Sequence, residues 1–195
     1  MLLNIIHPYV FKLIGDTLNI GPIEEFVDRD TKVKTLVEKV QKSGGKVLLH
    51  NYSDGNLIRE VMHKSAFYED PLFSFLFEED IEKVTTTPYG VPILDKKPAN
   101  IKENDWNVLL GIYTKHSELR IKTEGHETIA FIGGALERCL ANAAIYFAKN
   151  YRTNGQKIFY VPELCVSFGE KGEALVKLAE NGIETMKYED ALHLN

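Results

Sequence analysis

Cys139 is the residue whose type and position point most directly to chemistry. It follows an apolar run, Thr128–Ile132, and the pair Gly133–Gly134, and it opens a segment with helical spacing. The first turn of a helix carries exposed N–H groups and partial positive charge, which favour a thiolate and can stabilise an oxyanion. Lys96 and Lys97, which follow another apolar run, could lower the pKa of the thiol further. The alternative is that Cys139 is a small buried hydrophobe, as most free cysteines are.

Short apolar runs alternate along the chain with segments whose apolar residues recur at helical spacing. The runs are continuously apolar, which is typical of strands buried on both faces. This alternation predicts a mainly parallel sheet with helices on both sides, that is, a three-layer α/β/α domain. The predicted strands are Leu2–Ile6, Lys46–His50, Val91–Leu94, Thr128–Ile132, Lys157–Val161 and a weaker run at Ile183–Lys187. The predicted helices contain Val33–Val40, Trp106–Tyr113, Leu136–Phe147 and Ala174–Ala179.

The segment Asn51–Thr87 does not fit this alternation. It mixes acidic residues with an aromatic-rich stretch, Phe67–Phe77, which could fill the core or line a partner surface. No linker is long enough to divide the chain, so we expect residues 1–195 to form one domain.

Composition excludes several classes of protein. The formal net charge of −5 disfavours a general nucleic-acid binder, because phosphate affinity needs clustered Lys and Arg. Two cysteines cannot build a disulfide framework, and no apolar run approaches the roughly 20 residues of a membrane helix. The apolar start, Met1–Phe11, has neither a basic leader nor a small-residue cleavage site. We therefore expect a cytoplasmic protein that contacts neither nucleic acid nor membrane.

The run Ile129–Cys139 (IAFIGGALERC) resembles the strand, turn and helix that carry the nucleophile in the isochorismatase-like cysteine hydrolases. The resemblance places the nucleophile at Cys139, six residues after Gly133. The stretch Lys97–Ile101 (KPANI), which leads to Trp106, resembles a segment whose lysine is catalytic in one branch of the family, so Lys97 takes that role. With Lys157–Ser167 and the first helix and second strand included, the likeness covers most of the chain. It implies the Rossmann-like α/β/α fold of that family.

Departures from the family pattern concern the base and the metal. The family triad is Asp, Lys and Cys, but here Ile6 stands where the Asp belongs, and His7 follows it. Metal-binding members carry D-x-H after the second strand, where this chain has Asn51 and Ser53. We therefore expect no metal and no cofactor.

Two hypotheses follow from these residues. In the first, His7 replaces the missing base, and the protein hydrolyses a C–N bond of a small amide as nicotinamidase-like or carbamoyl-amide-cleaving members do. Cys139 would then attack, Lys97 would hold the thiolate, and backbone N–H groups around Arg138 and Cys139 would form the oxyanion hole. Gly134 and Trp106 complete the set of predicted binding residues.

In the second hypothesis, the domain has lost its chemistry and kept the fold as a binding or assembly module. Either hypothesis is compatible with a homo-oligomer that binds a small molecule, because family members commonly assemble.

Overall fold

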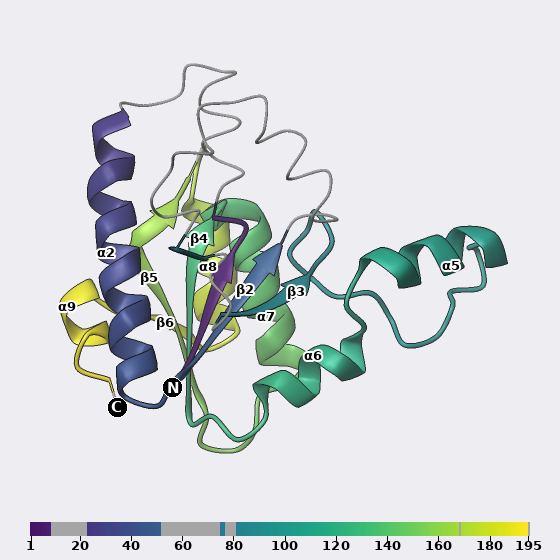
Figure 1. Cartoon of the computed structure of the whole chain (residues 1–195). Helices are drawn as coiled ribbons and strands as arrows, with labels where there is room; N and C mark the ends of the chain where they lie inside the picture. The colour runs from purple at the N-terminus through teal and green to yellow at the C-terminus, as the bar shows by residue number, and fades with distance from the viewer. Residues whose placement is uncertain (9–22, 52–74, 77–80, 168, 195) are drawn as a thin grey trace.

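A computed structural model describes residues 1–8, 23–51, 75–76, 81–167 and 169–194 of the chain (Figure 1). Its centre is one six-stranded sheet in which every neighbouring pair of strands is parallel. The order of the strands is β3-β2-β1-β4-β5-β6. The strands are β1 (Leu2–Ile6), β2 (Lys46–Asn51), β3 (Glu82–Thr85), β4 (Thr128–Gly134), β5 (Lys157–Val166) and β6 (Ile183–Thr185). The expected parallel sheet is confirmed.

Helices cover both faces of the sheet, as a three-layer α/β/α domain requires (Figure 1). One face packs against α2 (Ile23–Lys42) and α9 (Tyr188–Ala191). The other packs against α6 (His116–Thr123), the π-helical turn η2 (Leu136–Leu140), α7 (Ala141–Asn150) and α8 (Gly172–Glu180). Side chains alternate between the two cores: Leu3 and Ile5 of β1 face one, while Leu2 and Ile6 face the other.

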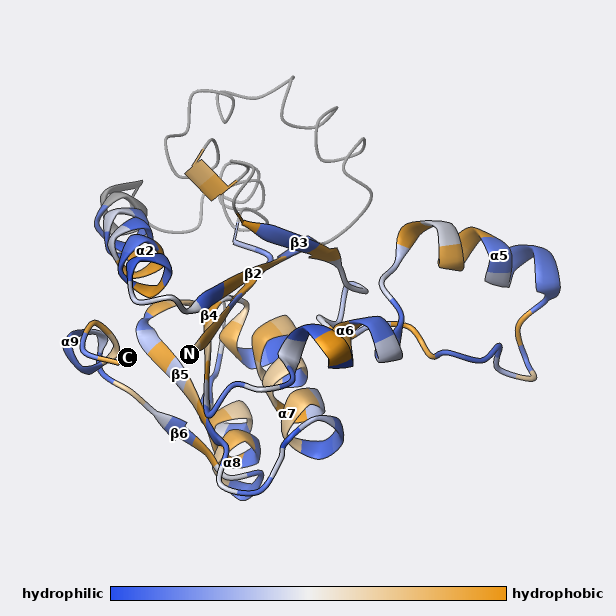
Figure 2. Cartoon of the chain, turned by 60° about the horizontal axis from the view of Figure 1, so that its bottom comes forward, coloured by the Kyte–Doolittle hydropathy of each residue, from blue (hydrophilic) through white to orange (hydrophobic). Residues whose placement is uncertain are grey.

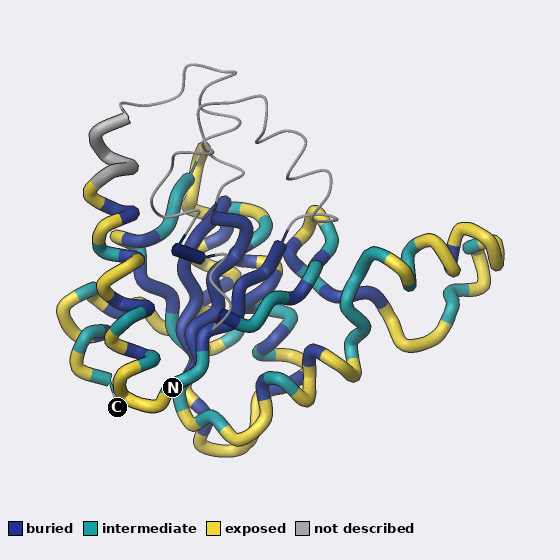
Figure 3. Tube along the Cα trace, in the orientation of Figure 1, coloured by how far each residue is buried: buried dark blue, intermediate teal, exposed yellow. Residues whose placement is uncertain are grey.

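The hydrophobic pattern of the sequence explains why these elements form. The strands of the sheet interior are mainly apolar in Figure 2 and buried in Figure 3, as the continuously apolar runs predict. In α2, the four apolar residues at helical spacing between Val33 and Val40 are all buried. The helix ends where Gly44 adopts a positive φ of 76° and the N–H of Gly45 donates to the Val40 carbonyl at 2.8 Å.

The third strand lies elsewhere than the sequence predicts. The prediction of a strand at Val91–Leu94 is wrong: only Ile93 makes a β-bridge there, with Lys115, and β3 is Glu82–Thr85. As an edge strand it is only half-buried, so its alternating polar sequence lacked the apolar run on which the prediction relied. Residues 52–74 and 77–80 lie outside the described part, so the aromatic stretch is described only at Phe75 and Leu76, both buried.

A long excursion between β3 and α6 stands away from the rest of the molecule. This arm (residues 94–114) contains α5 (Glu103–Ile112) and projects from the body in both Figure 1 and Figure 2. Backbone bonds close its base, from the Ile93 N–H to the Thr114 carbonyl at 3.1 Å and from the His116 N–H to the Ile93 carbonyl at 2.8 Å. The arm therefore leaves and re-enters the body at one point.

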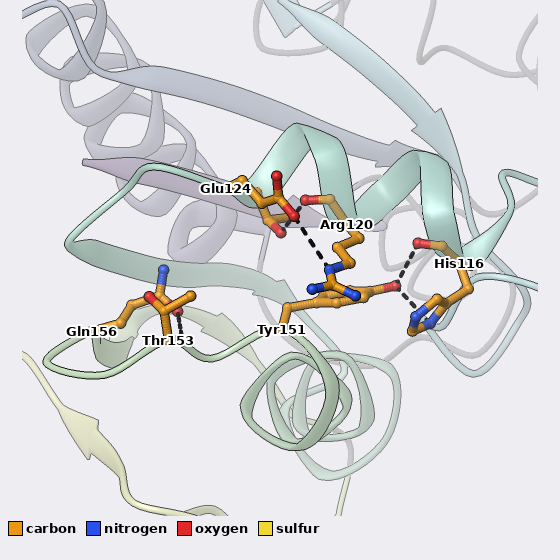
Figure 4. A network of polar contacts seen from close by, with 7 residues as sticks. His116, Arg120, Glu124, Tyr151, Thr153 and Gln156 are labelled. Atoms are coloured by element: carbon orange, nitrogen blue, oxygen red, sulfur yellow. Dashed lines mark hydrogen bonds and ion pairs between the residues drawn. The ribbon is translucent and has the colours of Figure 1, made fainter.

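Polar contacts fix the helix that follows the arm. The Tyr151 hydroxyl donates to the His116 carbonyl at 3.0 Å and lies 3.2 Å from the His116 Nδ1 (Figure 4). Arg120 of α6 also pairs at 3.2 Å with Glu124, the residue that directly follows this helix. The contacts of Tyr151 tie α6 to the end of α7, so the re-entry point of the arm is anchored.

No helix in the described part of the chain is long and apolar enough to cross a membrane.

Candidate active site

Cys139 lies just beyond the carboxyl end of β4, within the π-helical turn η2. The Leu140 N–H donates to the Ala135 carbonyl at 3.0 Å, which gives this turn its wide spacing. The Cys139 side chain is half-buried. Ligands bind at the carboxyl edge of parallel sheets, so the predicted nucleophile lies where sites of this architecture form.

The turn between β4 and η2 depends on Gly133. Its φ is +102°, and a Cβ atom added there would lie 2.2 Å from the backbone oxygen of Ile6 on the neighbouring strand. Only a glycine combines this dihedral with so close an approach. The pair Gly133–Gly134 thus lets the chain leave the sheet beside β1 and deliver Cys139 to its edge.

Replacing Gly133 with alanine is expected to destabilise the fold by about 2–4 kcal/mol, because the new Cβ both strains the backbone and displaces β1. Gly155→Ala is a matched control, since Gly155 also has a positive φ, +81°, but nothing lies within 4 Å of its added Cβ. Urea denaturation of both variants measures the difference. Equal losses of stability would show that the close approach to Ile6 carries no cost.

The Cys139 thiol is a hydrogen-bond donor in this structure. Its Sγ donates to the carbonyl of Pro88 at 3.1 Å. Burial raises the pKa of the thiol above its ordinary value, while backbone bonds from Ala135 and Cys139 and the nearby Arg138 charge act in the opposite direction. The resting side chain is therefore a protonated thiol.

The backbone N–H groups of Ala135 and Cys139 act to lower the pKa of the thiol, against the larger effect of burial. Such groups are the kind that stabilise an oxyanion. The N–H of Arg138 instead donates to the Ala135 carbonyl at 3.0 Å, and its side chain is exposed. Gly134 is buried at the end of β4, paired with Val166 of β5. The Arg138 N–H, which the sequence singled out together with that of Cys139, is therefore engaged within the turn.

His7 lies at the end of β1 with a fully buried ring and a φ of +41°. The ring Nε2 of His7 lies 3.0 Å from the Thr86 hydroxyl. The backbone N–H of His7 donates to the His50 carbonyl at 3.1 Å. Burial lowers the pKa of His7 to about 4, so the ring is neutral at pH 7. Thr86 precedes Pro88 by two residues, so one segment contacts both His7 and Cys139.

Ile6 is the last residue of β1, and the sequence resemblance places the Asp of the family pattern at this position. It is fully buried in the same apolar cluster as Leu136 and Leu140 of η2. It pairs in register with Gly133 on one side and with His50 on the other. The side chain that faces η2 from this strand end is therefore apolar, and it contributes packing rather than charge.

The structure does not bring Lys97 or Trp106 to Cys139. The Lys97 Nζ donates to the Ile101 carbonyl at 2.8 Å, within the arm. Trp106 is buried in α5 of the same arm, which stands off from the sheet (Figure 1). Cys139, Gly134 and Arg138 therefore form one group at the sheet edge, and the two arm residues form another.

Some functional groups near the thiol were not found from the sequence. The Pro88 carbonyl and the Ala135 N–H are backbone atoms, which every residue has, so residue type gives no signal for them. The Pro88-Tyr89-Gly90 sequence, however, is a recognisable turn pattern. In the described ranges no cluster of three or more His, Cys, Asp or Glu side chains is arranged to hold a metal ion.

Comparisons with known proteins were made at two levels. By sequence, the chain matches no protein-family model and no curated protein. By structure, it is similar to an isochorismatase-like hydrolase from Alkaliphilus metalliredigens, with a TM-score of 0.55 and 16% identity over 98% of this chain and 95% of that one.

Two further solved structures are similar over nearly the whole chain. YcaC from Escherichia coli, described as an octameric hydrolase of unknown specificity, gives a TM-score of 0.55 and 14% identity over 98% of this chain and 76% of that one. N-carbamoylsarcosine amidase from Thermoplasma acidophilum gives a TM-score of 0.52 and 14% identity over 96% of this chain and 95% of that one. With the six-stranded parallel sheet and the helices on both faces, these likenesses show that the chain has the isochorismatase-like hydrolase fold.

Proposed function

We propose that this protein is a cysteine hydrolase that cleaves a C–N bond of a small amide, with Cys139 as the nucleophile. The observation that carries the proposal is the placement of a half-buried thiol just beyond the carboxyl end of β4, in the turn η2, where the backbone N–H groups of Ala135 and Cys139 act to lower its pKa. A nucleophile beside preorganised N–H donors is the arrangement that acyl transfer requires. Amide-cleaving activity in a protein of similar fold, N-carbamoylsarcosine amidase, supports the choice of substrate class.

The reaction proceeds in two steps. The sulfur of Cys139 adds to the substrate carbonyl carbon, and the carbonyl oxygen becomes an oxyanion that accepts hydrogen bonds from the Ala135 and Cys139 N–H groups. The C–N bond then breaks, the nitrogen leaves with the proton lost by the thiol, and a thioester remains. Water hydrolyses the thioester to a carboxylic acid and restores the thiol. No electrons are gained or lost, so the reaction needs no redox partner.

His7 is our candidate for the group that carries the thiol proton to the leaving nitrogen. It is neutral above pH 4, and it contacts the segment whose Pro88 carbonyl accepts the Cys139 thiol. A pKa of about 4 makes it a weak base, which predicts slow turnover. Lys97 stays a candidate through the family resemblance alone: to meet Cys139, the arm has to change position or come from a second copy of the chain.

The test is ammonia release from nicotinamide and N-carbamoylsarcosine at pH 7.5, with the purified full chain. Release that saturates with substrate and scales with protein concentration supports the proposal. No release from either compound, or from a wider panel of small primary amides, contradicts it.

One observation favours a second candidate, a non-catalytic binding protein of this fold. The strand end that faces η2 carries the apolar Ile6, and burial keeps the thiol protonated. This candidate predicts that a small amide binds and raises the melting temperature while no ammonia is released.

The net charge of −5 favours a small-molecule ligand over nucleic acid for either candidate function. We expect the protein to act in the cytoplasm.

We also propose that copies of the chain assemble through the arm. The arm exposes Leu94 and Val108, and YcaC, which has a similar fold, is described as octameric. Light scattering is expected to give a mass that is a multiple of 22.1 kDa, and Val108→Glu is expected to lower it. Ile121→Glu, which changes an equally exposed apolar residue on α6, is the control and should leave the mass unchanged. A monomeric wild-type protein would contradict assembly.

A further inference from the structure

A tight turn packs against Cys139. This cap turn (residues 87–90) follows β3 and is closed by the Gly90 N–H, which donates to the Thr87 carbonyl at 2.7 Å. The Thr87 N–H also donates to the Val91 carbonyl at 2.9 Å. Proline at the second position and glycine at the fourth are the residues that such turns prefer. The turn is therefore a defined unit.

The cap turn touches Cys139 at two points. Its Pro88 carbonyl accepts the thiol hydrogen bond at 3.1 Å. Its Gly90, with a φ of +79°, lies so close that an added Cβ would be 2.3 Å from the Cys139 carbonyl oxygen and 3.3 Å from the Ala143 Cβ. Both the side chain and the backbone of Cys139 are thus covered by the same four residues.

This contact conflicts with attack on a substrate. A reacting carbonyl must come within about 3–3.5 Å of the sulfur, and the Pro88 carbonyl already lies at that distance. The bond to Pro88 also holds the sulfur as a thiol. A substrate carbonyl that approaches the sulfur from the side of Pro88 therefore has to displace the Pro88 carbonyl.

The ends of the cap turn are fixed, while its outer side is exposed. On one side, Thr86 bonds His7 through its hydroxyl at 3.0 Å and donates its N–H to the Asn51 carbonyl at 3.0 Å. On the other, Ile93 is held in the backbone pairing at the base of the arm. Tyr89, at the tip, is 70% exposed. A short unit fixed at both ends and exposed at its tip can swing without disturbing the sheet.

We propose that the cap turn is a gate over Cys139: it covers the thiol in the resting protein and lifts, breaking the bond between Sγ and the Pro88 carbonyl, to admit a small planar amide. The identity of the amide rests on the proposed function, whereas the gate itself does not.

The test is the rate at which acrylamide, a small amide that alkylates thiols, modifies each cysteine at pH 8, read by mass spectrometry of peptides. In Gly90→Ala the added Cβ pushes the turn off Cys139, and Cys139 is expected to react about tenfold faster than in wild type. Gly125→Ala is the matched control, because Gly125 also has a positive φ, +84°, but nothing lies near its added Cβ. Its rate should equal the wild-type rate.

Cys165 reports whether Gly90→Ala unfolds the protein, because its pKa in the folded protein is raised to about 12 and the half-buried thiol therefore reacts slowly at pH 8. If Cys165 is also alkylated faster in Gly90→Ala, a second variant, Pro88→Gly, tests the gate instead. This substitution loosens the turn without adding atoms, and it should raise the alkylation rate of Cys139 but not that of Cys165. Unchanged Cys139 rates in the folded variants would overturn the gate. Faster alkylation without ammonia release from any amide supports the gate while the proposed hydrolase function fails.

Discussion

Replacing Cys139 with serine is expected to lower kcat/KM for amide hydrolysis by at least about 1000-fold, because the variant loses the only nucleophile that the proposed reaction uses. A serine hydroxyl at this position would need a strong base, and the strand end beside η2 offers the apolar Ile6 instead. Ammonia release under saturating substrate measures the effect.

Cys165→Ser is the control for this substitution. Cys165 donates its thiol to the Val161 carbonyl at 3.0 Å, and burial raises its pKa to about 12, so it is inert. A serine there can donate the same hydrogen bond, and activity should stay close to that of the wild type. Equal losses in both variants would indicate a folding defect rather than a lost nucleophile.

The second large effect concerns stability in acid. His7 and His50 are both fully buried, and burial lowers their pKa values to about 4 and about 3. A histidine whose pKa is lower in the folded state stabilises the fold above its unfolded pKa of about 6.5, and this contribution disappears as the pH falls toward the folded value. We expect a loss of about 3 kcal/mol for each of the two histidines between pH 7 and pH 4.

Urea denaturation at pH 7 and pH 4 measures this loss, and two substitutions assign it. His50→Gln keeps a donor for the Asn4 side chain, which lies 3.0 Å from the His50 Nε2, and it removes the titrating ring. His7→Asn suits the positive φ at that position. Each of these two substitutions should reduce the loss of stability between pH 7 and pH 4. His193→Gln, at an exposed position, should leave that loss unchanged. If the variants lose as much stability in acid as the wild type, other groups cause the loss.

The sequence was sufficient to predict the sheet and most of its helices because the core strands are buried on both faces. Leu2–Ile6, Thr128–Ile132 and Lys157–Val161 are apolar runs in the sequence and lie in β1, β4 and β5 of the structure. The predicted helix starting near Leu136 also forms, although its first turn is π-helical. The edge strand β3 was missed because half of its residues meet solvent, so its pattern resembles that of a loop.

The candidate site was predicted only in part, for a related reason. Cys139 follows a strand and lies in the first helical turn after it, as the sequence predicts, whereas Gly133 and Gly134 are the last two residues of β4 rather than a turn after the strand. Whether Lys97 reaches the thiol depends on the path of the whole arm (residues 94–114), which no local pattern encodes. The Pro88 carbonyl that bonds the thiol is a long-range backbone contact, 51 residues away along the chain.

The apolar Ile6 distinguishes this chain from the catalytic pattern that it otherwise resembles. The sequence resemblance implies a carboxylate at this strand end, whereas here the thiol donates to a backbone carbonyl and burial depresses the pKa of His7, the residue that follows β1. This combination predicts a slow hydrolase with a closed resting state. It also separates the hydrolase from the binding protein experimentally, because only the hydrolase forms a covalent bond to its ligand.

The most direct test of the hydrolase proposal is a search for that covalent bond. The wild-type protein is incubated with nicotinamide or N-carbamoylsarcosine, quenched in acid within seconds, and digested for mass spectrometry of the peptide that contains Cys139. The proposal predicts that this peptide gains the mass of the substrate acyl group, that Cys139→Ser abolishes the gain, and that ammonia appears in equal amount in the first turnover. Ammonia release without the adduct in rapidly quenched samples, or with an adduct on another residue, would contradict Cys139 as the nucleophile.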